Sequence, residues 1–244
     1  MCLSVVHSAL RSFHPPAKGS GGVRPLREEC AAPVATGERL VRRVHALASA
    51  DGGRVVVGIA GCPGAGKSTL AGRLAARLTA SGLPAVWVPM DGFHLADVEL
   101  ERLGRLGRKG AMDTFDAHGY LALLRRVRAE TSAVVYAPSF DREIEQPIAG
   151  AIPVPPAARV VVSEGNYLLA TADPWPGVRA AMTEVWYAEI DDAVRLDRLT
   201  RRHVEFGKSP EQAVRWVAEV DEPNAEAIRA TRGSADLLVN PDTF

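Results

Sequence analysis

Several features are scarce or absent in this sequence of 244 residues, and each absence excludes a class of protein. The three cysteines, Cys2, Cys30 and Cys62, lack CxxC or Cys/His spacing, so we expect neither a disulfide framework nor a structural zinc site. No apolar run reaches the roughly 20 residues needed to cross a bilayer. Residues 1–10 lack a basic segment and a convincing cleavage site, so we expect no secretory signal and a cytoplasmic location.

The sequence also lacks an excess of charge of either sign, because 29 Lys and Arg balance 29 Asp and Glu. A neutral chain creates no global field, and no basic stripe with interleaved aromatic residues occurs, so we expect no binding to nucleic acid or membranes. Any anion that the protein binds must therefore be held locally. Lysine is rare, which makes the position of each lysine informative; the four are Lys18, Lys67, Lys109 and Lys208.

What the sequence does contain is a regular alternation of strand and helix patterns. Residues 55–60 form a continuous apolar run rich in β-branched side chains, which is typical of a strand buried on both faces. Similar runs occur at 85–90, 134–136, 160–162, 184–190 and 237–239. Helical patterns occur between and after them at 67–79, 120–129, 178–182, 193–205 and 209–218. This alternation predicts an α/β fold in which helices cover both faces of a mostly parallel sheet.

The first 32 residues differ in composition from the rest of the chain. They mix His14-Pro15-Pro16 and Gly19-Ser20-Gly21-Gly22 with little periodicity, which predicts a flexible N-terminal tail over residues 1–32. A helical pattern starts at Pro33 and ends at Asp51-Gly52-Gly53. Because no internal repeat is visible, we expect a single domain over residues 33–244.

The segment directly after the first strand matches GxxxxGK[ST], the phosphate-binding loop or P-loop. It follows a strand and opens a helix, as this motif requires. Its glycines let successive N–H groups point inward, and the helix N-terminus adds partial positive charge. We expect Lys67 to bridge the β- and γ-phosphates of a nucleoside triphosphate and Ser68 to bind Mg²⁺. The candidate nucleotide-binding residues are Gly61, Gly64, Ala65, Gly66, Lys67, Ser68 and Thr69.

Two acidic residues follow predicted strands. Asp91 comes after the strand at 85–90, and Glu164 follows the strand at 160–162. The carboxyl ends of parallel strands meet at the edge of the sheet where ligands bind. Asp91 could accept the proton of an attacking hydroxyl or help to hold Mg²⁺, and Glu164 has the layout of a Walker-B acid that orients Mg²⁺. In each case the alternative is an acid that merely opens a turn.

A helical segment near the C-terminus carries a cluster of basic residues. Arg195, Arg198 and Arg202 share one broad helical face. One interpretation is an Arg-rich lid over about residues 192–220 that closes on the nucleotide, with Arg202 as the candidate catalytic arginine. The alternative is a solvated helix whose charges pair with neighbouring aspartates.

Taken together, these motifs resemble the phosphoribulokinase, uridine kinase and type I pantothenate kinase superfamily of P-loop kinases. The likeness covers roughly residues 52–240 and is most similar to a bacterial branch labelled nucleoside/nucleotide kinase family or fructose-transport-system kinase. The matching segments are Gly61–Thr69, Met90–Phe93, Arg108–Gly110, Asp113–Asp116, Tyr136, Glu164-Gly165 and Ala235–Val239. The resemblance implies a P-loop NTPase three-layer sandwich that uses ATP and Mg²⁺ to phosphorylate an alcohol group of a small molecule, with Asp91 as the general base.

The acceptor is less well defined. The candidate acceptor-binding residues are His94, Arg108, Lys109, Tyr136 and Arg142, for each of which a surface ion pair or a structural hydrogen bond is the alternative. The adjacent charges of Arg108 and Lys109 indicate an acceptor with a carboxylate or phosphate. Gly110 stands where uridine kinases usually carry an acid that grips ribose, and residues 136–142 lack the Tyr-Ser-His segment of pantothenate kinases. A sugar, a nucleoside or a pantothenate-like acceptor therefore stays open.

Our hypothesis is in-line transfer of the γ-phosphoryl group of ATP to a hydroxyl held near Asp91. Two rivals stay open: a nucleoside monophosphate kinase, and a regulator that binds ATP without turnover. A GTPase is disfavoured because no Asn-Lys-x-Asp segment, which reads guanine, occurs in the sequence. We expect a small-molecule acceptor as the partner, and the sequence leaves a homodimer open.

Overall fold

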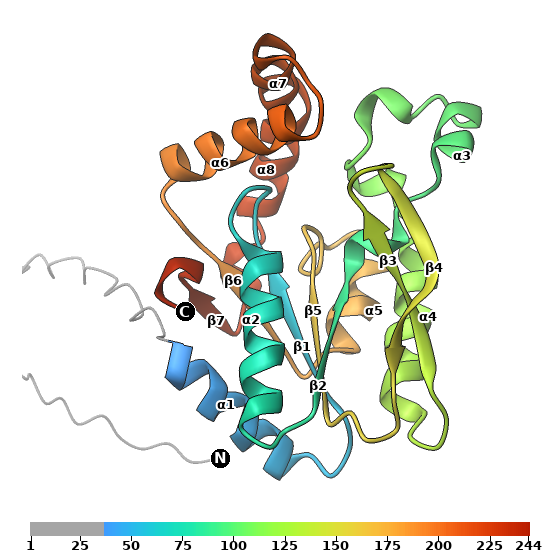
Figure 1. Ribbon diagram of the computed structural model, residues 1–244, viewed down its shortest axis with the longest axis vertical. Helices are drawn as coiled ribbons and strands as arrows, with labels where there is room; N and C mark the ends of the chain where they lie inside the picture. Colours follow the sequence, from blue (N-terminus) through green and yellow to red (C-terminus); the bar gives the residue numbers. More distant parts are fainter. Residues whose placement is uncertain (1–36) are drawn as a thin grey trace, which may run out of the picture. The chain divides into compact units, whose positions relative to one another are not determined.

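The computed structural model describes residues 37–244; the tail predicted for residues 1–32 lies outside the described residues. Its central sheet has five parallel strands in the order β2-β5-β1-β6-β7 (Figure 1). Glu164 at the end of β5 lies opposite Ile59 of β1 and Pro89 of β2, so the carboxyl ends of these strands lie together. The strands are β1 Val55–Ala60, β2 Ala85–Pro89, β5 Val160–Glu164, β6 Glu184–Ala188 and β7 Leu237–Val239.

Helices cover both faces of this sheet, because alternate residues of a buried strand point to opposite faces. Val55, Val57 and Ile59 of β1 belong to the core formed with α1 and α2, whereas Val56 and Ala60 belong to the core formed with α4 and α5. The predicted three-layer α/β fold is confirmed. The covering helices are α1 Gly37–Ala50, α2 Lys67–Ala80, α4 Ala117–Ala129 and α5 Trp175–Ala180.

One predicted strand does not belong to the central sheet. The run at residues 134–136 begins β3 (Val135–Asp141), which pairs antiparallel with β4 (Gln146–Val154) in a separate two-stranded sheet. This hairpin packs closely on the turn that contains Asp91. A Cβ atom on Gly92 would lie 2.5 Å from the carbonyl oxygen of Pro138, so only glycine allows this approach. The hairpin thereby forms a wall beside the end of β2.

The chain after β6 forms a helical segment beyond the carboxyl ends of the strands, and the short helix α3 lies on the other side of this region (Figure 1). The predicted lid at about 192–220 corresponds to α6, α7 and most of a π-helical turn, whereas α3 and α8 were not predicted. None of the helices in residues 37–244 has both the length and the apolar character needed to span a bilayer. The elements are α3 Asp97–Arg102, α6 Asp192–Glu205, α7 Pro210–Trp216, the turn Val217–Asp221 and α8 Glu222–Arg229.

Candidate active site

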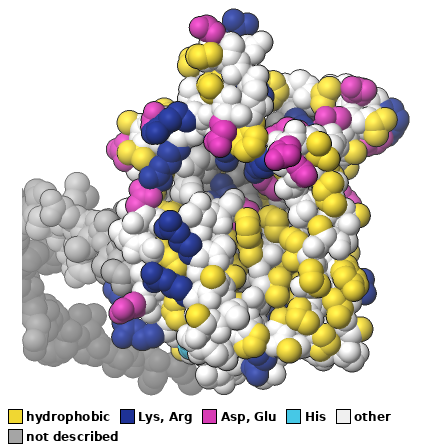
Figure 2. All heavy atoms as spheres, viewed as in Figure 1, with side chains coloured by type: hydrophobic (Ala, Val, Ile, Leu, Met, Phe, Trp, Pro, Cys, Tyr) yellow, Lys and Arg dark blue, Asp and Glu magenta, His cyan; other side chains and the backbone are white. Residues whose placement is uncertain are grey.

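A cavity of about 820 Å³ opens where the strands of the central sheet end. Figure 2 shows the surface hollowed between the α6–α8 segment and the side that carries α3 and the hairpin. The P-loop, the ends of β2 and β5, the hairpin and the C-terminal helices all contribute to its walls. The predicted site residues that line it are Gly64, Gly66, Lys67, Ser68, Thr69, Asp91, His94, Lys109, Arg142, Glu164 and Arg202.

Two predicted nucleotide-binding residues support the P-loop from behind instead of lining the cavity. Ala65 is buried, with 2% of its surface exposed. A Cβ atom on Gly61 would lie 2.7 Å from the carbonyl oxygen of Ala188, so the loop leaves β1 in close contact with β6. Their small size lets the rest of the loop curl, which is an indirect contribution to the site.

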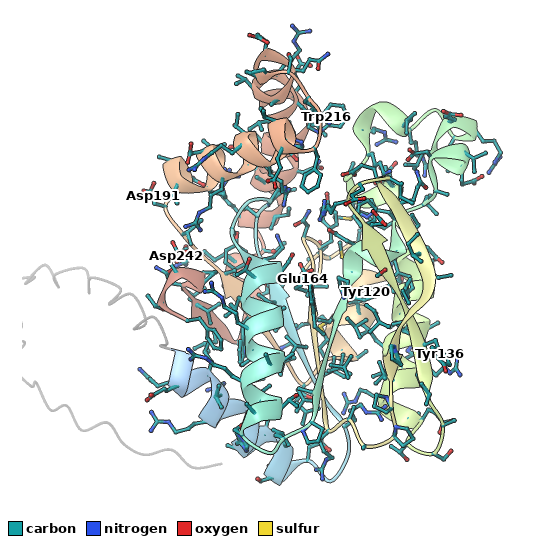
Figure 3. The ribbon with its side chains drawn as sticks, in the orientation of Figure 1. Tyr120, Tyr136, Glu164, Asp191, Trp216 and Asp242 are labelled. Carbon is teal, nitrogen blue, oxygen red and sulfur yellow. The ribbon has the colours of Figure 1, made fainter. Side chains whose placement is uncertain are left out.

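Two residues that were predicted to bind the acceptor, Tyr136 and Arg108, lie outside the cavity, and the structure therefore does not place them in an acceptor pocket. Tyr136 is 59% exposed on the outer face of the hairpin (Figure 3), because Val135 and Ala137 on either side of it point into the core. The half-exposed side chain of Arg108 donates to the carboxylate of Asp113 at 2.5 Å. Neither residue lines the cavity.

The P-loop has the geometry of an anion site. Gly66 has a left-handed φ of 83° and precedes α2 without any side-chain cap, so the first N–H groups of this helix have no side-chain acceptor. The buried Lys67 directs its Nζ to the carbonyl oxygen of Cys62 at 2.9 Å. Burial lowers the pKa of Lys67 to about 8, although Glu164 and Asp91 act in the opposite direction. Free N–H groups and a buried lysine fit the triphosphate tail of a nucleotide.

Glu164 lies at the floor of the cavity (Figure 3) and is only 3% exposed. Burial and the neighbouring Asp91 carboxylate raise its pKa, and the charges of Lys67 and Arg142 with the hydroxyl of Ser68 offset this only in part. Ser68 and Glu164 thus place two oxygen donors beside each other. Such donors are what Mg²⁺ prefers in proteins, so this pair fits the cation.

Asp91 lies on the short 3₁₀ turn Met90–Phe93 that follows β2, and two cationic or polar neighbours hold it. Its Oδ2 accepts a hydrogen bond of 2.5 Å from Arg142, and its backbone oxygen lies 2.8 Å from Nδ1 of His94. Because a carbonyl oxygen only accepts, Nδ1 of His94 is the donor. Burial would raise the pKa of Asp91, but the charge of Arg142, with further contributions from the interactions with His94, Lys67 and Arg202, outweighs burial and lowers it. Asp91 is therefore an ionised acceptor facing the cavity.

The three arginines of the predicted lid face have three different environments. Arg195 is 2% exposed and donates to Asp192, Glu222 and the carbonyl oxygen of Pro63 in the P-loop. Arg198 pairs with Asp242 at 2.9 Å. Arg202 lines the cavity, and in the part of the chain that the structure describes it forms no ion pair. Arg202 is thus the arginine of this face whose charge is available to a ligand.

Several cavity residues were not found by sequence reasoning, and they include four Phe and Trp side chains. Phe115 and Phe140 line one side of the cavity, and Phe206 and Trp216 line the other. Nζ of Lys208 lies 4.7 Å from the centroid of the Trp216 ring, which points into the hollow (Figure 3). Asn166 could have been found from the Glu164-Gly165 step that precedes it, but isolated aromatic residues carry no such signal.

Comparisons with known proteins place the chain among P-loop kinases. The family model of the methylmalonyl Co-A mutase-associated GTPase MeaB matches residues 29–92, a region that includes the P-loop. The chain is 33% identical over 195 residues to "Putative uridine kinase C227.14" of Schizosaccharomyces pombe, which covers 76% of this chain and 83% of that protein. It is 36% identical over 131 residues to the ATP-dependent kinase-like protein notR' of Aspergillus versicolor, which covers 51% of this chain and 76% of that protein.

Solved structures agree with this assignment. A "putative fructose transport system kinase" from Silicibacter sp. TM1040 is 41% identical with a TM-score of 0.77, covering 84% of this chain and 98% of that chain. YFH7 of Saccharomyces cerevisiae, at 17% identity and a TM-score of 0.72, shares the fold over 84% of this chain and 98% of that chain. The chain therefore belongs to the phosphoribulokinase, uridine kinase and type I pantothenate kinase superfamily of P-loop kinases.

Proposed function

We propose that this protein is an ATP-dependent phosphotransferase that moves the γ-phosphoryl group to an alcohol group of a small metabolite. The observation that supports this most is the convergence of Lys67, Asp91, Glu164 and Arg202 on one cavity. The cavity has the size of a small-molecule site, which suits a nucleotide and a small acceptor. Membership of the P-loop kinase superfamily supports the kinase reaction.

On the donor side, the N–H groups at the start of α2 hold the β- and γ-phosphates. Lys67 exchanges the carbonyl oxygen of Cys62 for a phosphate oxygen, because a charged acceptor forms the stronger hydrogen bond. Ser68 and Glu164 would hold Mg²⁺, which would supply positive charge that offsets the charge of the phosphates. Arg202, which lines the same cavity, stabilises the charge that develops on the transferring group.

On the acceptor side, the substrate hydroxyl lies beside Asp91. As the hydroxyl oxygen forms its bond to the γ-phosphorus, the bond from that phosphorus to the bridging oxygen of ADP breaks. Asp91 accepts the hydroxyl proton and afterwards returns it to water. The products are ADP and the phosphorylated alcohol, and the protein is unchanged.

The test is an ADP-release assay of the purified protein with MgATP and a panel of polyols, sugars, nucleosides, pantothenate-like acids and nucleoside monophosphates. We expect turnover with an alcohol acceptor above the acceptor-free rate. Turnover with nucleoside monophosphates only would replace this proposal by a monophosphate kinase. ATP binding without turnover on any acceptor would favour a regulator.

The Asp91→Asn variant tests the general base in the same assay. We expect kcat to fall by about 10²- to 10⁴-fold, while the Kd for ATP changes by less than about threefold, because the proton acceptor is lost but the P-loop is intact. Asp173→Asn is the matched control, since the side chain of Asp173 is 92% exposed. A near wild-type kcat in Asp91→Asn, with normal ATP binding, would show that Asp91 is not the base.

A further inference from the structure

We infer that the phosphoryl acceptor carries a carboxylate or phosphate group and that Arg142 binds this group. The inference rests on the proposed alcohol phosphorylation and narrows its acceptor to an anionic hydroxy compound. It comes from the way in which the cations around the acceptor side of the cavity are paired.

Arg142 lies at the turn between β3 and β4, and its side chain lines the cavity. Its guanidinium carbon lies 5.0 Å from the centroid of the Phe140 ring, which supports the group from one side. Among the described residues, one hydrogen bond engages this guanidinium, that of Nη2 to Oδ2 of Asp91 at 2.5 Å. A guanidinium has five N–H donors in a planar fork, so Arg142 has donors left for a ligand.

The other basic residues at this end of the cavity have counter-ions of their own. Lys109, on the same Phe140 ring at 5.6 Å, pairs with Asp97 at 2.6 Å and also donates to the carbonyl oxygen of Glu145. Arg108 pairs with Asp113 outside the cavity. The sequence suggested that Arg108 and Lys109 bind an anion of the acceptor. In the structure their charges are instead neutralised by Asp113 and Asp97 of the protein itself.

His94 is not the cation that binds the anionic group of the acceptor. Its Nδ1 donates to the backbone of Asp91, and burial lowers the pKa of its ring. Lys67 and Arg202 line the same cavity, and the proposed reaction assigns both to the phosphates of ATP. Arg142 thus differs from Lys109 and Arg108, because its counter-ion is Asp91, the proposed general base.

This pairing has a consequence for the reaction. When Asp91 takes up the acceptor proton it becomes neutral, and Arg142 loses its counter-charge. An unpaired charge in a partly buried site is less favourable than a paired one. A carboxylate or phosphate on the acceptor would keep Arg142 paired throughout the transfer and would match its fork in a bidentate contact. A neutral acceptor offers no such compensation, so it is expected to be the poorer substrate.

The test compares matched acceptors that differ in one anionic group: gluconate with sorbitol, pantothenate with panthenol, and ribose 5-phosphate with ribose. In wild-type protein we expect the anionic member of the accepted pair to have a kcat/KM at least about 10-fold higher, which corresponds to about 1.4 kcal/mol for a partly buried charged contact. The carboxylate and phosphate pairs distinguish the two sources of the anion.

Arg142→Gln should reduce this anionic-to-neutral ratio to within about threefold, whereas Arg142→Lys should keep part of it, because lysine retains the charge without the fork. Arg102→Gln is the control, since Arg102 pairs with Glu99 on the exposed surface of α3 and should leave the ratio unchanged. Circular dichroism and ATP titration confirm that each variant folds and binds nucleotide.

Two results would overturn the inference while the proposed function stands: equal use of both members by the wild type, or an equal loss on both members in Arg142→Gln. Turnover with neutral acceptors alone would also overturn it, whereas absence of turnover with every alcohol in the ADP-release panel would overturn the proposed function and this inference with it.

Discussion

Asp91 and Glu164 are two carboxylates in one cavity whose surroundings shift their pKa values in opposite directions. Arg142 lies against Asp91 and outweighs the effect of burial, whereas Glu164 is buried beside the charge of Asp91. Pairs of titratable groups with separated pKa values often divide the roles of a reaction. Here the ionised Asp91 suits proton uptake, and Glu164 suits a cation that would replace its proton.

The raised pKa of Glu164 predicts a pH-dependent stability of the ligand-free protein. Its pKa of about 7 in the folded state exceeds the value of 4.5 for an ordinary glutamate, so the folded state binds more protons between these two pH values. Stability therefore falls as pH rises through this window. Glu164→Gln removes the penalty, so the variant should gain roughly 2 kcal/mol in unfolding free energy relative to wild type on going from pH 5 to pH 8.

Urea unfolding at pH 5, 6, 7 and 8 measures this difference. Glu226→Gln, the same change at an exposed position on α8, should show no such trend. A constant difference between Glu164→Gln and wild type would show that Glu164 ionises in the folded chain as it does in the unfolded chain, and a difference that shrinks toward pH 8 would show that folding lowers its pKa.

At the scale of elements, one buried arginine, Arg54, links the end of α4 to the loop before β5 by hydrogen bonds. Arg54 is 3% exposed and donates to the carbonyl oxygens of Val127, Glu130, Pro155 and Ala158 at distances of 2.6 to 3.0 Å. Val127 and Glu130 lie at the end of α4, and Pro155 and Ala158 lie in the connection between β4 and β5. The guanidinium thus satisfies carbonyl groups that the helix itself leaves unpaired.

Arg54→Met should lower the free energy of unfolding by about 3 kcal/mol or more, because several buried carbonyl groups lose their donor at once. Urea denaturation with Arg39→Met, an exposed position on α1, as the control measures the effect. If Arg54→Met stayed within about 0.5 kcal/mol of wild type, water would have to replace these hydrogen bonds, and Arg54 would not be a structural link.

The elements that could be predicted are those whose signal is local. The strand at residues 55–60 and the P-loop after it are contiguous in sequence, and topology then places Asp91 and Glu164 at the same edge. The hairpin could not be predicted in this way. Pro147 and Pro153 make the sequence of β4 look like a loop, and β3 has its pairing partner only if β4 is recognised as a strand. The structure corrects the assignment of residues 134–136 to the central sheet for this reason.

The same distinction applies to the candidate site. Lys67 lies in a contiguous motif, so its position follows from the sequence. Tyr136 and Trp216 have no such signal: which one faces the cavity depends on the side of a hairpin and on the packing of α7. Helical spacing grouped Arg195 with Arg202, but it could not show that the first is buried against the P-loop and the second lines the cavity.

At the scale of the whole molecule, Arg195 connects the P-loop to the C-terminal helices. It contacts Pro63 in the loop, Asp192 at the start of α6 and Glu222 at the start of α8. The packing is close, since a Cβ atom on Gly64 would lie 2.6 Å from the carbonyl oxygen of Arg195. The start of α6 is therefore fixed to the loop, and a closing movement is expected in the part that follows it, from Arg202 onward.

This connection predicts that nucleotide binding stabilises the C-terminal helices together with the P-loop. With Mg²⁺ and a non-hydrolysable ATP analogue, hydrogen exchange should slow at residues 61–70 and also at residues 192–229, because both ends of the Arg195 network become more rigid. In Arg195→Met the protection of residues 61–70 should persist, while that of residues 192–229 should decrease at least about threefold in exchange rate. Arg201→Met is the control, because Arg201 pairs with Asp197 on the exposed side of α6. Protection confined to the P-loop in the wild type would mean that the two regions are not coupled and that Arg195 serves local packing alone.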